Sequence, residues 1–394
     1  MTFWHAVNWG AGSILALAWF SRIVDAAIGM RHVADVSAHA WGGKPVFDGS
    51  TPRVSIIVPA RNEADDIAET LRGLLALDYE NYEVIAVNDR STDRTGQIMN
   101  EVAASAATHA ILRVIQVEKL PPGWLGKTHA MWLAAQQATG DWLLFTDADV
   151  VFRPESVGRA IAYAETEKAD HVVMFPHLIM KSPGEIMMIA FFQTLFVFGH
   201  RPWKVADPST DDHMGVGAFN LVRRSVYEAV GTYHKLRMEV LDDMKLGKVV
   251  KNAGYAQRNV FGGDLISIRW ARGAMGVVRN LTKNFFAVLS FQWPRTLASC
   301  FGLAFLNLGP FVGLWFSHGW LRAIYGVALA SMFAIYIGLS RRSSVPPYYF
   351  FLHPVSTILF VYTLLRSMFH TLSNDGIVWR GTRYPLEELR KGMV

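Results

Sequence analysis

Long uncharged runs of apolar residues lie near both ends of the chain, whereas the middle alternates shorter apolar and polar stretches. The runs Leu297–Leu321 and Ala323–Leu339 contain no charged residue. A membrane-spanning helix needs about 20 predominantly apolar residues. We therefore expect two spanning helices joined by a tight turn near Ser317–Trp320. The overall pattern predicts an N-terminal transmembrane anchor over residues 1–30 and C-terminal membrane helices over residues 296–370.

Two further apolar runs are less regular. Trp4–Val24 is apolar apart from Arg22, whose long side chain can reach the interface from a helix end. A cleaved signal peptide is disfavoured there, because no Lys or Arg precedes the apolar stretch. Tyr348–Phe369 is interrupted by a His-Pro pair and by Arg366, so it could span the membrane or lie in the interface; if the tail after it is cytoplasmic, a partly buried or re-entrant segment is expected.

Basic residues flank these runs unequally. None precedes the first run, whereas Arg22 and Arg31 follow it, and the expected turn at Ser317–Trp320 carries none. The positive-inside rule therefore predicts a multi-pass protein of the cell (inner) membrane, with residues 31–295 in the cytoplasm. The tail, residues 371–394, is also basic, so a cytoplasmic tail is expected.

Between the membrane segments, short apolar runs alternate with amphipathic stretches. Val54–Ala60 is a continuous β-branched run that predicts a buried strand, and Ala64–Leu77 has apolar residues at helical spacing. The further elements expected are strands at Tyr82–Asn88, Leu112–Val117 and Asp141–Thr146, and helices at Arg94–Ala106 and His129–Ala138. This alternation predicts βαβ units and an α/β fold whose mostly parallel sheet is covered on both faces.

Composition narrows the class of protein. Hydrophobic residues make up 51% of the chain and charged residues 18%, which excludes a disordered protein and argues against an ordinary soluble enzyme. Cys300 is the single cysteine, so a disulfide framework and a cysteine-based zinc site are excluded. The net charge of +5 comes from basic residues beside apolar runs. That distribution favours an anionic phospholipid membrane as partner and disfavours nucleic acid.

Polar residues follow three of the predicted strands. Arg61–Glu63 follows the first strand, Asp89 the second, and Asp147 and Asp149 the fourth. Ligands of parallel sheets bind beyond these carboxyl ends. Two carboxylates two residues apart suit a divalent cation that also binds substrate phosphates. An isolated pair of this kind is more often a solvated turn, but Asp89 beside it favours a metal–diphosphate site, with Asp89 accepting hydrogen bonds from a base or ribose.

The segments VSIIVPARNEADDI, VNDRSTDRT and FTDADV occur in this order and spacing, and together they resemble the GT-A domain of family 2 glycosyltransferases. The resemblance covers roughly residues 52–290. With its flanking membrane segments, the chain further resembles the lipid-associated branch, which includes ceramide glucosyltransferases and the hopanoid- and carotenoid-associated bacterial members. The resemblance implies a nucleotide-diphospho-sugar transferase fold and an inverting, nucleotide-sugar-dependent reaction.

The resemblance also implies roles for the acidic residues. Asp89 would contact the nucleotide, and Asp147 and Asp149 would hold Mg²⁺ or Mn²⁺, with Asp149 the more direct ligand. Asp243 matches the family's general base, which takes the proton of the acceptor hydroxyl, and Asp242 beside it lies on the acceptor side. Helix capping is the alternative role for one of this last pair. The implied donor-binding residues are Pro59, Ala60, Arg61, Glu63, Asp89, Lys127, Asp147, Ala148, Asp149, Arg269 and Trp270.

Two donor-side assignments have open alternatives. Lys127 matches a Gly-Lys of the family that contacts phosphate, but it also fits a surface lysine, and the upstream glycine of a P-loop is missing. Arg269 and Trp270 match the end of the family's Gln/Arg-x-x-Arg-Trp motif, where they would neutralise diphosphate charge and offer a stacking face. Interfacial anchoring is the alternative for this pair. The first motif position is Ile266, a departure that weakens a processive polymer-synthase interpretation.

Several segments flank the expected site. Gly217, Ala218 and Phe219 belong to a small-residue motif that opens the acceptor side in this family. Ile186–Phe198 is too short for a confident span and fits either a core helix or an interfacial helix beside the acceptor. The basic and aromatic tail at residues 379–390 would either close over the donor site or anchor at the interface. The histidines show no metal-ligand spacing.

These patterns lead to one principal hypothesis. The chain is expected to be a membrane-bound hexosyltransferase that moves a single sugar from a nucleoside diphosphate sugar, with UDP the expected nucleotide, to a lipid or isoprenoid-type acceptor. Two alternatives are a processive polysaccharide synthase and a catalytically inactive membrane scaffold with the same fold. The sequence leaves open which sugar, which acceptor and which oligomeric state apply.

Overall fold

The computed structural model describes residues 3–42, 50–105 and 111–394, and within them the chain divides into two compact units. The helical unit takes its residues from Met1–His32, Met180–Trp203 and Trp270–Ile377. The α/β unit takes its residues from Val33–Ile179, Lys204–Arg269 and Val378–Val394. The helical unit therefore includes segments that hydropathy alone assigns to the central domain, and the tail after residue 377 groups with the α/β unit.

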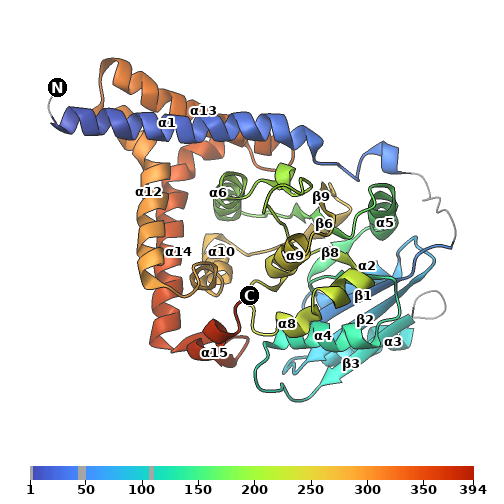
Figure 1. Ribbon diagram of the computed structural model, residues 1–394. Helices are drawn as coiled ribbons and strands as arrows, with labels where there is room; N and C mark the ends of the chain where they lie inside the picture. Colours follow the sequence, from blue (N-terminus) through green and yellow to red (C-terminus); the bar gives the residue numbers. More distant parts are fainter. Residues whose placement is uncertain (1–2, 43–49, 106–110) are drawn as a thin grey trace. The chain divides into compact units, whose positions relative to one another are not determined.

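Among the described residues, the α/β unit is built on a seven-stranded sheet of order β3-β2-β1-β4-β8-β6-β9 (Figure 1). β8 runs antiparallel to β4 and β6, and the other neighbouring strands pair in parallel, so the predicted mostly parallel sheet is confirmed. The strands are β1 (Val54–Ala60), β2 (Tyr82–Asp89), β3 (Ile111–Val117), β4 (Trp142–Phe145), β6 (His171–Phe175), β8 (Asn220–Arg223) and β9 (Gln257–Phe261).

Helices cover both faces of this sheet. One face carries α2 (Ile67–Leu75), α3 (Thr95–Ser105) and α5 (Ser156–Thr166), and the other carries α4 (Gly126–Gln137), α7 (Arg224–Ala229), α8 (Thr232–Lys235) and α9 (Asp242–Asn252). α4 begins three residues before the expected start at His129, so Lys127 lies in its first turn. Ala106, the expected end of α3, lies outside the described residues.

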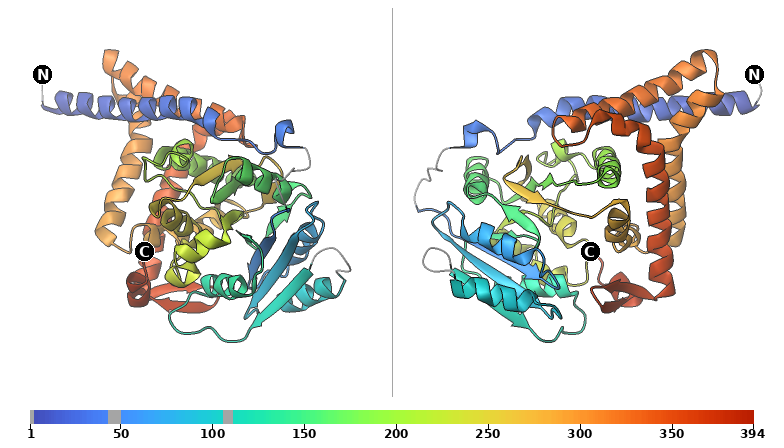
Figure 2. Two further views of the ribbon diagram at one scale, coloured as in Figure 1. Left: turned by 45° about the vertical axis from the view of Figure 1, so that its right-hand side comes forward. Right: turned by 180° about the vertical axis from the view of Figure 1, so that it is seen from behind.

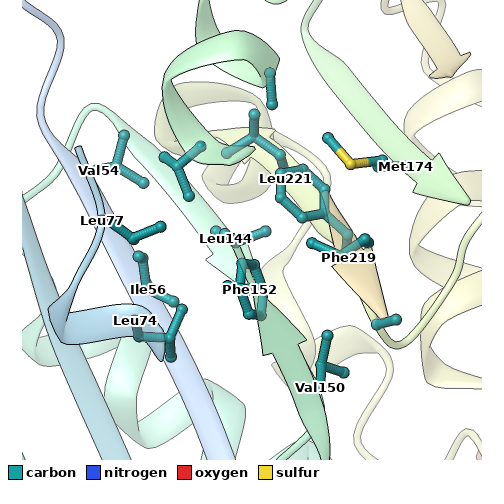
Figure 3. Packing of buried hydrophobic residues seen from close by; sticks show 14 of the residues in the cluster. Val54, Ile56, Leu74, Leu77, Leu144, Val150, Phe152, Met174, Phe219 and Leu221 are labelled. Atoms are coloured by element: carbon teal, nitrogen blue, oxygen red, sulfur yellow. The ribbon is translucent and has the colours of Figure 1, made fainter. Parts of the chain in front are cut away.

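The continuous apolar character of the central strands follows from this double cover. Successive side chains of a strand point to opposite faces, and in β1 Ile56 and Val58 pack on the α2 side whereas Ile57 packs on the α4 side. In β4, Leu144 packs on the α2 side and Phe145 on the α4 side. Figure 3 shows part of the hydrophobic cluster on the α2 side of the sheet. Its labelled residues are Val54, Ile56, Leu74, Leu77, Leu144, Val150, Phe152, Met174, Phe219 and Leu221.

A second, small sheet joins three short segments that are far apart in the sequence. It has the order β5-β10-β7, formed by β5 (Val150–Phe152), β10 (Ile266–Ile268) and β7 (His177–Leu178). β10 pairs antiparallel to β5 with Ile268 opposite Val150. Arg269 directly follows β10, and Asp149 directly precedes β5. The tail forms a hairpin of β11 (Gly376–Trp379) and β12 (Thr382–Pro385), followed by α15 (Leu386–Lys391).

The helical unit contains long apolar helices. Its helices are α1 (Phe3–Gly29), α6 (Pro183–Gly199), α10 (Ala274–Thr282), α11 (Phe285–Val288), α12 (Trp293–Phe316), α13 (Gly319–Ser340) and α14 (His353–Ser373). In the described part of the chain, four segments are long and apolar enough to cross a membrane, namely Phe3–His32, Trp293–Phe316, Gly319–Ser340 and Pro347–Ser373. Figure 2 shows α1 beside α13 and α12 beside α14.

The surface of these helices is strongly apolar. Trp315 is 80% exposed, Trp320 82% and Phe301 73%. Exposed apolar surface on this scale marks an interaction surface. The prediction of apolar helices at both ends of the chain is therefore confirmed.

The last apolar segment, expected to be partly buried or re-entrant, forms one long helix. After a 3₁₀ turn at Pro347–Leu352, α14 runs without a break for 21 residues. Pro354 does not interrupt it because it lies in the first helical turn, where the missing N–H would have no partner in the helix.

One buried histidine inside the helical unit has polar partners on two other helices. The ring of His353 is fully buried, and its nitrogens lie 2.9 Å from Asn307 Oδ1 and 3.0 Å from the Tyr336 hydroxyl. These contacts join α12, α13 and α14. The helix α6, which includes the segment Ile186–Phe198, belongs to this unit, with Phe191 4.7 Å from Phe360 between ring centroids.

Candidate active site

The sequence-predicted acidic residues come from the carboxyl ends of neighbouring strands and from the start of one helix. Asp89 is the last residue of β2, and Asp147 and Asp149 follow β4. Asp242 and Asp243 form the first turn of α9. Because β1 lies between β2 and β4, the ends of these strands meet at one edge of the sheet.

Lys127 joins two of the acidic segments. Its Nζ lies 2.8 Å from Asp147 Oδ1 and 3.4 Å from Asp242 Oδ2. Burial disfavours the charge of this lysine, but the carboxylates of Asp147, Asp242 and Asp243 outweigh burial and raise its pKa, so it stays protonated. Burial raises the pKa of Asp242 to about 7, and Lys127 opposes the shift. Lys127 is therefore an internal ion-pair partner.

Asp243 is held by backbone N–H groups. Its Oδ1 accepts a hydrogen bond from the Met244 N–H at 2.7 Å, and its carboxylate also accepts one from the Gly217 N–H. Burial nevertheless raises the pKa of Asp243 above its ordinary range. A carboxylate with a raised pKa is a stronger proton acceptor, which suits a general base.

Gly217 lies where a larger residue would not fit. A Cβ at this position would lie 2.5 Å from Asp147 Oδ2, while the Gly217 carbonyl accepts a hydrogen bond from the Asp147 N–H at 3.0 Å. The glycine therefore allows Asp147 and Asp243 to approach each other. A recess at this point is lined by Lys127, Met131, Phe145, Thr146, Asp147, Gly217, Asn220, Tyr233, Asp242 and Asp243.

The donor set at Asp147 and Asp149 fits a hard divalent cation. Burial is the main cause that raises the pKa of Asp149 to about 7, with the negative charges of Asp147 and Glu63 adding to it. A cation between such carboxylates would relieve this repulsion. No cluster of three or more His, Cys, Asp or Glu able to hold a metal occurs in residues 3–42, 50–105 and 111–394. Two carboxylates are enough for Mg²⁺ when substrate phosphates supply further ligands.

Asp89 has a different environment. Its two carboxylate oxygens accept hydrogen bonds from Arg90 at 2.7 and 2.9 Å, and Arg61 Nη1 lies 3.8 Å from Oδ2. Arg90 can turn back onto its neighbour because its φ is 53°, in the left-handed region. Gly126 packs against the same carboxylate, since a Cβ there would lie 2.2 Å from Asp89 Oδ2. Gly126 and Lys127 therefore connect the Asp89 region to the acidic cluster.

Other predicted residues are buried in the framework. Ala148 is buried and its carbonyl accepts a hydrogen bond from Thr70 at 2.9 Å. Ala218 lies in the hydrophobic core, as does Phe219 (Figure 3), and the Ala218 carbonyl accepts a hydrogen bond from Thr146 at 2.8 Å. Pro59 and Ala60 are the last two residues of β1. Trp270 belongs to the helical unit, where its ring lies 5.0 Å from that of Phe192.

Sequence reasoning missed several residues of this region. Arg90 is the most directly involved, and its position immediately after Asp89 was the available signal. Asn220 and Tyr233 line the recess without any motif that would mark them. Arg380 and Tyr384 lie in the tail, for which closure over the donor site was one of two expectations; Arg380 pairs with Glu63, and the Tyr384 hydroxyl accepts a hydrogen bond from the Gly126 N–H.

Comparisons with known proteins agree with this architecture. Residues 55–231 match the family described as "Glycosyl transferase family 2". A 4,4'-diaponeurosporenoate glycosyltransferase of Staphylococcus haemolyticus is 24% identical over 251 residues, which cover 63% of this chain and 65% of that enzyme, just short of two thirds of its length. An enzyme of the same name from Staphylococcus aureus is 22% identical over 383 residues, covering 94% of this chain and 100% of the relative.

The fold also matches a solved structure. A mannosyltransferase from Pyrobaculum calidifontis, determined in complex with GDP-Man and Mn²⁺, aligns with a TM-score of 0.54 over 93% of this chain and 99% of that one. The sequence identity is 19%, so the likeness concerns the fold. Together with the family match, it confirms the predicted GT-A fold.

Proposed function

Because this chain is a family 2 glycosyltransferase, we propose that it transfers one sugar, with inversion, from a nucleoside diphosphate sugar to an isoprenoid-type lipid at the cytoplasmic face of the cell membrane. UDP is the expected nucleotide. The observation that supports this most is the Lys127 ammonium between Asp147 and Asp242, because it joins the expected metal-binding pair to the expected acceptor-side pair.

On the donor side, Asp89 would bind the base or ribose, and Asp147 and Asp149 would hold Mg²⁺ or Mn²⁺. Such a cation offsets the charge that develops on the departing diphosphate. Lys127 would assist the same charge from the first turn of α4, since it stays protonated beside its carboxylate partners. Arg269, which directly follows β10, would supply a further cation on the donor side.

On the acceptor side, Asp243 would take the proton of an attacking hydroxyl. The relatives' name specifies an acceptor that ends in a carboxylate, diaponeurosporenoate. A carboxylate is already ionised at neutral pH and needs no base. The buried, proton-accepting character of Asp243 therefore favours a hydroxyl acceptor, and the relatives favour a carboxylate.

The tail limits the membrane topology. Residues 378–394 pack within the α/β unit, so the tail and that unit lie on the same side of the membrane. An even number of crossings must then separate them, whereas α12, α13 and α14 are three candidates. We propose that α12 and α13 cross as a hairpin whose turn carries no charge, and that α14, the most buried of the four apolar segments, does not cross.

The topology is tested by cysteine labelling. The single natural cysteine is first replaced in Cys300→Ser, and His318→Cys or Lys391→Cys is then added. In right-side-out vesicles, an impermeant maleimide should label position 318 and not position 391. Equal labelling at both positions contradicts the proposed hairpin.

The activity is tested in membranes from cells that express the protein at matched levels with and without the Asp149→Asn change. Membranes with the unchanged protein, supplied with a UDP-sugar and Mn²⁺, should produce a lipid heavier by one hexose or N-acetylhexosamine in mass spectra. The variant membranes should not. A polymer product would instead support a processive synthase, which the Ile266 departure disfavours, and absence of nucleotide binding would support an inactive scaffold.

A further inference from the structure

The turn of the C-terminal hairpin contains an arginine in an unfavourable backbone conformation. Arg380 and Gly381 connect β11 to β12, with φ of 45° and 77°. A two-residue hairpin turn with both φ values positive favours Asn-Gly or Gly-Gly, because a large side chain is disfavoured in the left-handed region. Non-glycine residues held in this way cluster at functional sites, so the Arg380 side chain needs an explanation.

The guanidinium of Arg380 binds the loop that follows β1. Its Nη1 donates to the carbonyl of Arg61 and, at 3.2 Å, to that of Asn62, and its Nη2 pairs with the Glu63 carboxylate. Asn62 itself has a φ of 53°. Arg380 thus holds a loop with one residue in the left-handed region, in which Arg61 lies 3.8 Å from Asp89 and Glu63 interacts electrostatically with Asp147.

The charge of Arg380 affects the acidic cluster as well as the loop. Glu63 adds its negative charge to that of Asp147 next to Asp149, and burial raises the pKa of Glu63, whereas Arg380 opposes this shift. The arginine therefore neutralises the carboxylate at the edge of the site where a diphosphate must bind. Without it, Glu63 would add uncompensated negative charge beside that position.

A second hairpin residue reaches the other part of the donor region. The buried Tyr384 hydroxyl accepts a hydrogen bond from the Gly126 N–H at 3.1 Å. Gly126 is the first residue of α4, and Leu125 before it provides no side-chain cap, so Tyr384 satisfies one of the helix's unpaired donors. Arg90 also hydrogen-bonds Tyr384 while it holds Asp89.

The hairpin is firmly attached to the α/β unit. Leu386 and Leu389 of α15 are buried, and Gly392 packs against Met238, where a Cβ would lie 2.3 Å from Met238 Cβ. The positions of Arg380 and Tyr384 are therefore set by packing as well as by their own hydrogen bonds.

We propose that Arg380 is a positioning residue of the donor site, which holds the Arg61–Glu63 loop and balances its charge so that a nucleoside diphosphate binds, with Tyr384 fixing Arg90 and the start of α4. This inference rests on the proposed function. It makes the tail part of the donor site, through contacts that span 317 residues of sequence for Arg380 and 258 for Tyr384.

The test separates the side-chain contacts from the turn. Arg380→Asn keeps a residue that suits the left-handed turn and removes the guanidinium, and Tyr384→Phe removes the hydroxyl alone. Lys391→Ala is the matched control, since Lys391 is exposed and pairs only locally with Glu387. Binding of UDP with Mn²⁺ is measured by calorimetry on the full-length protein, together with donor KM, acceptor KM, kcat and the thermal midpoint.

We expect Arg380→Asn to weaken UDP binding and raise donor KM by about tenfold, as loss of a charge-assisted contact network implies. Acceptor KM and the thermal midpoint should stay at the values of the Lys391→Ala control, and Arg380→Lys should recover part of the binding. Tyr384→Phe should have a smaller effect in the same direction. Unchanged UDP binding in Arg380→Asn, or a loss matched by a lower thermal midpoint, overturns the inference.

The same measurements distinguish this inference from the proposed function. If the unchanged protein binds UDP but transfers no sugar, the proposed function fails, and the difference in UDP binding still decides the role of Arg380. If the unchanged protein transfers sugar and Arg380→Asn binds UDP equally well, only the role of Arg380 fails. If the unchanged protein binds no UDP, both are overturned.

Discussion

The two halves of the candidate site differ in how their carboxylates are balanced. In the half around Asp89, two carboxylates have an arginine partner, Arg90 for the buried Asp89 and Arg380 for the half-buried Glu63. In the other half, Asp147, Asp242 and Asp243 lie around the ammonium of Lys127, and the charge of Asp147 also acts on Asp149. Burial raises the pKa of Asp149 and Asp242 to about 7.

This difference indicates a division of labour. A carboxylate held by a two-pronged guanidinium keeps one orientation and one charge, which suits recognition of a fixed group such as a base or ribose. Like charges gathered in a buried place repel one another and favour binding of a cation or a proton. The arginine-paired half is therefore suited to recognition, and the aspartate-rich half to metal binding and proton transfer.

The sharpest way to break the comparison is to neutralise the expected base. Asp243→Asn should lower kcat for a hydroxyl acceptor by about 10²- to 10⁴-fold, because general base catalysis contributes that much. UDP binding should stay unchanged, as measured by calorimetry. Asp264→Asn is the control, since Asp264 is exposed and pairs with Arg153 on the surface. Full turnover of a hydroxyl acceptor by Asp243→Asn would show that Asp243 is not the base. Full turnover by this variant of a carboxylate acceptor alone would identify the acceptor as a carboxylate, which needs no base.

The expected metal ligand is the next position to test. Asp149→Asn keeps the size of the side chain but removes a charge and weakens its binding of a hard cation. The Mn²⁺-dependent part of UDP binding should fall by at least about tenfold in calorimetric titrations with and without the metal. The residual, metal-independent binding should match that of the unchanged protein. A variant that retains the full response to Mn²⁺ would argue against a metal at this pair.

The arginine-paired half predicts a smaller effect. Arg90→Lys keeps the charge but cannot form both hydrogen bonds to Asp89. Donor KM should rise by about tenfold while kcat changes little, because recognition is affected and the chemical step is not. Arg94→Lys is the matched control, since Arg94 is an exposed neighbour on the same loop. A fall in kcat at constant KM would place Arg90 in the chemical step. It would contradict the assignment of this half of the site to recognition alone.

The smallest effect on activity is expected beneath the aspartate-rich half. His171 is fully buried, hydrogen-bonded to Asn220 and to Gln257, and Asn220 lines the recess. Burial lowers the pKa of His171 to about 4. The unfolded chain binds a proton below a pH of about 6.5 and the folded one does not, so stability is full above that pH and falls as the pH drops towards 4.

His171→Gln removes this titration. Between pH 6.5 and pH 4, the free energy of unfolding of the unchanged protein should fall by about 3 kcal/mol more than that of the variant. This difference corresponds to the lowering of the His171 pKa from 6.5 to about 4. The measurement is the denaturant midpoint of the α/β unit's unfolding across this pH range in both proteins. Parallel pH dependence in the two would show that His171 is not buried in the neutral form. At pH 7.5 the folded variant should transfer sugar at a rate close to that of the unchanged protein.

Much of the fold was predictable because it depends on local pattern. The continuous apolar run of β1 follows from burial on both faces of the sheet, and the helical spacing of apolar residues in α2 follows from burial of one helix face. Asp89, Asp147 and Asp149 were identifiable because each ends or follows an apolar strand, and parallel strands bring such ends together. The exact start of α4 was missed because Gly126 is a weak helix former, and it is the packing of Gly126 against Asp89 that allows the earlier start.

The grouping of α6 and α10 with the long helices was not predictable. Both are short, and their sequences fit a core helix of either unit. Contacts such as Phe191 with Phe360, and the Gly273 N–H donating to Glu185 at 2.8 Å, decide their place. The same holds for α14, whose His353 interrupts the apolar pattern in sequence but is satisfied by Asn307 and Tyr336 in the structure.

The sequence by itself determined the apolar helices, the order of the motifs along the chain and the carboxylates that follow the strands. These features depend on hydrophobicity and side-chain spacing, which act over a few residues at a time. Only the tertiary structure decided which cation each carboxylate meets. Lys127 reaches Asp242, and Arg380 reaches Glu63 across 317 residues of chain. Such pairings depend on side-chain geometry at short range, which no local pattern encodes.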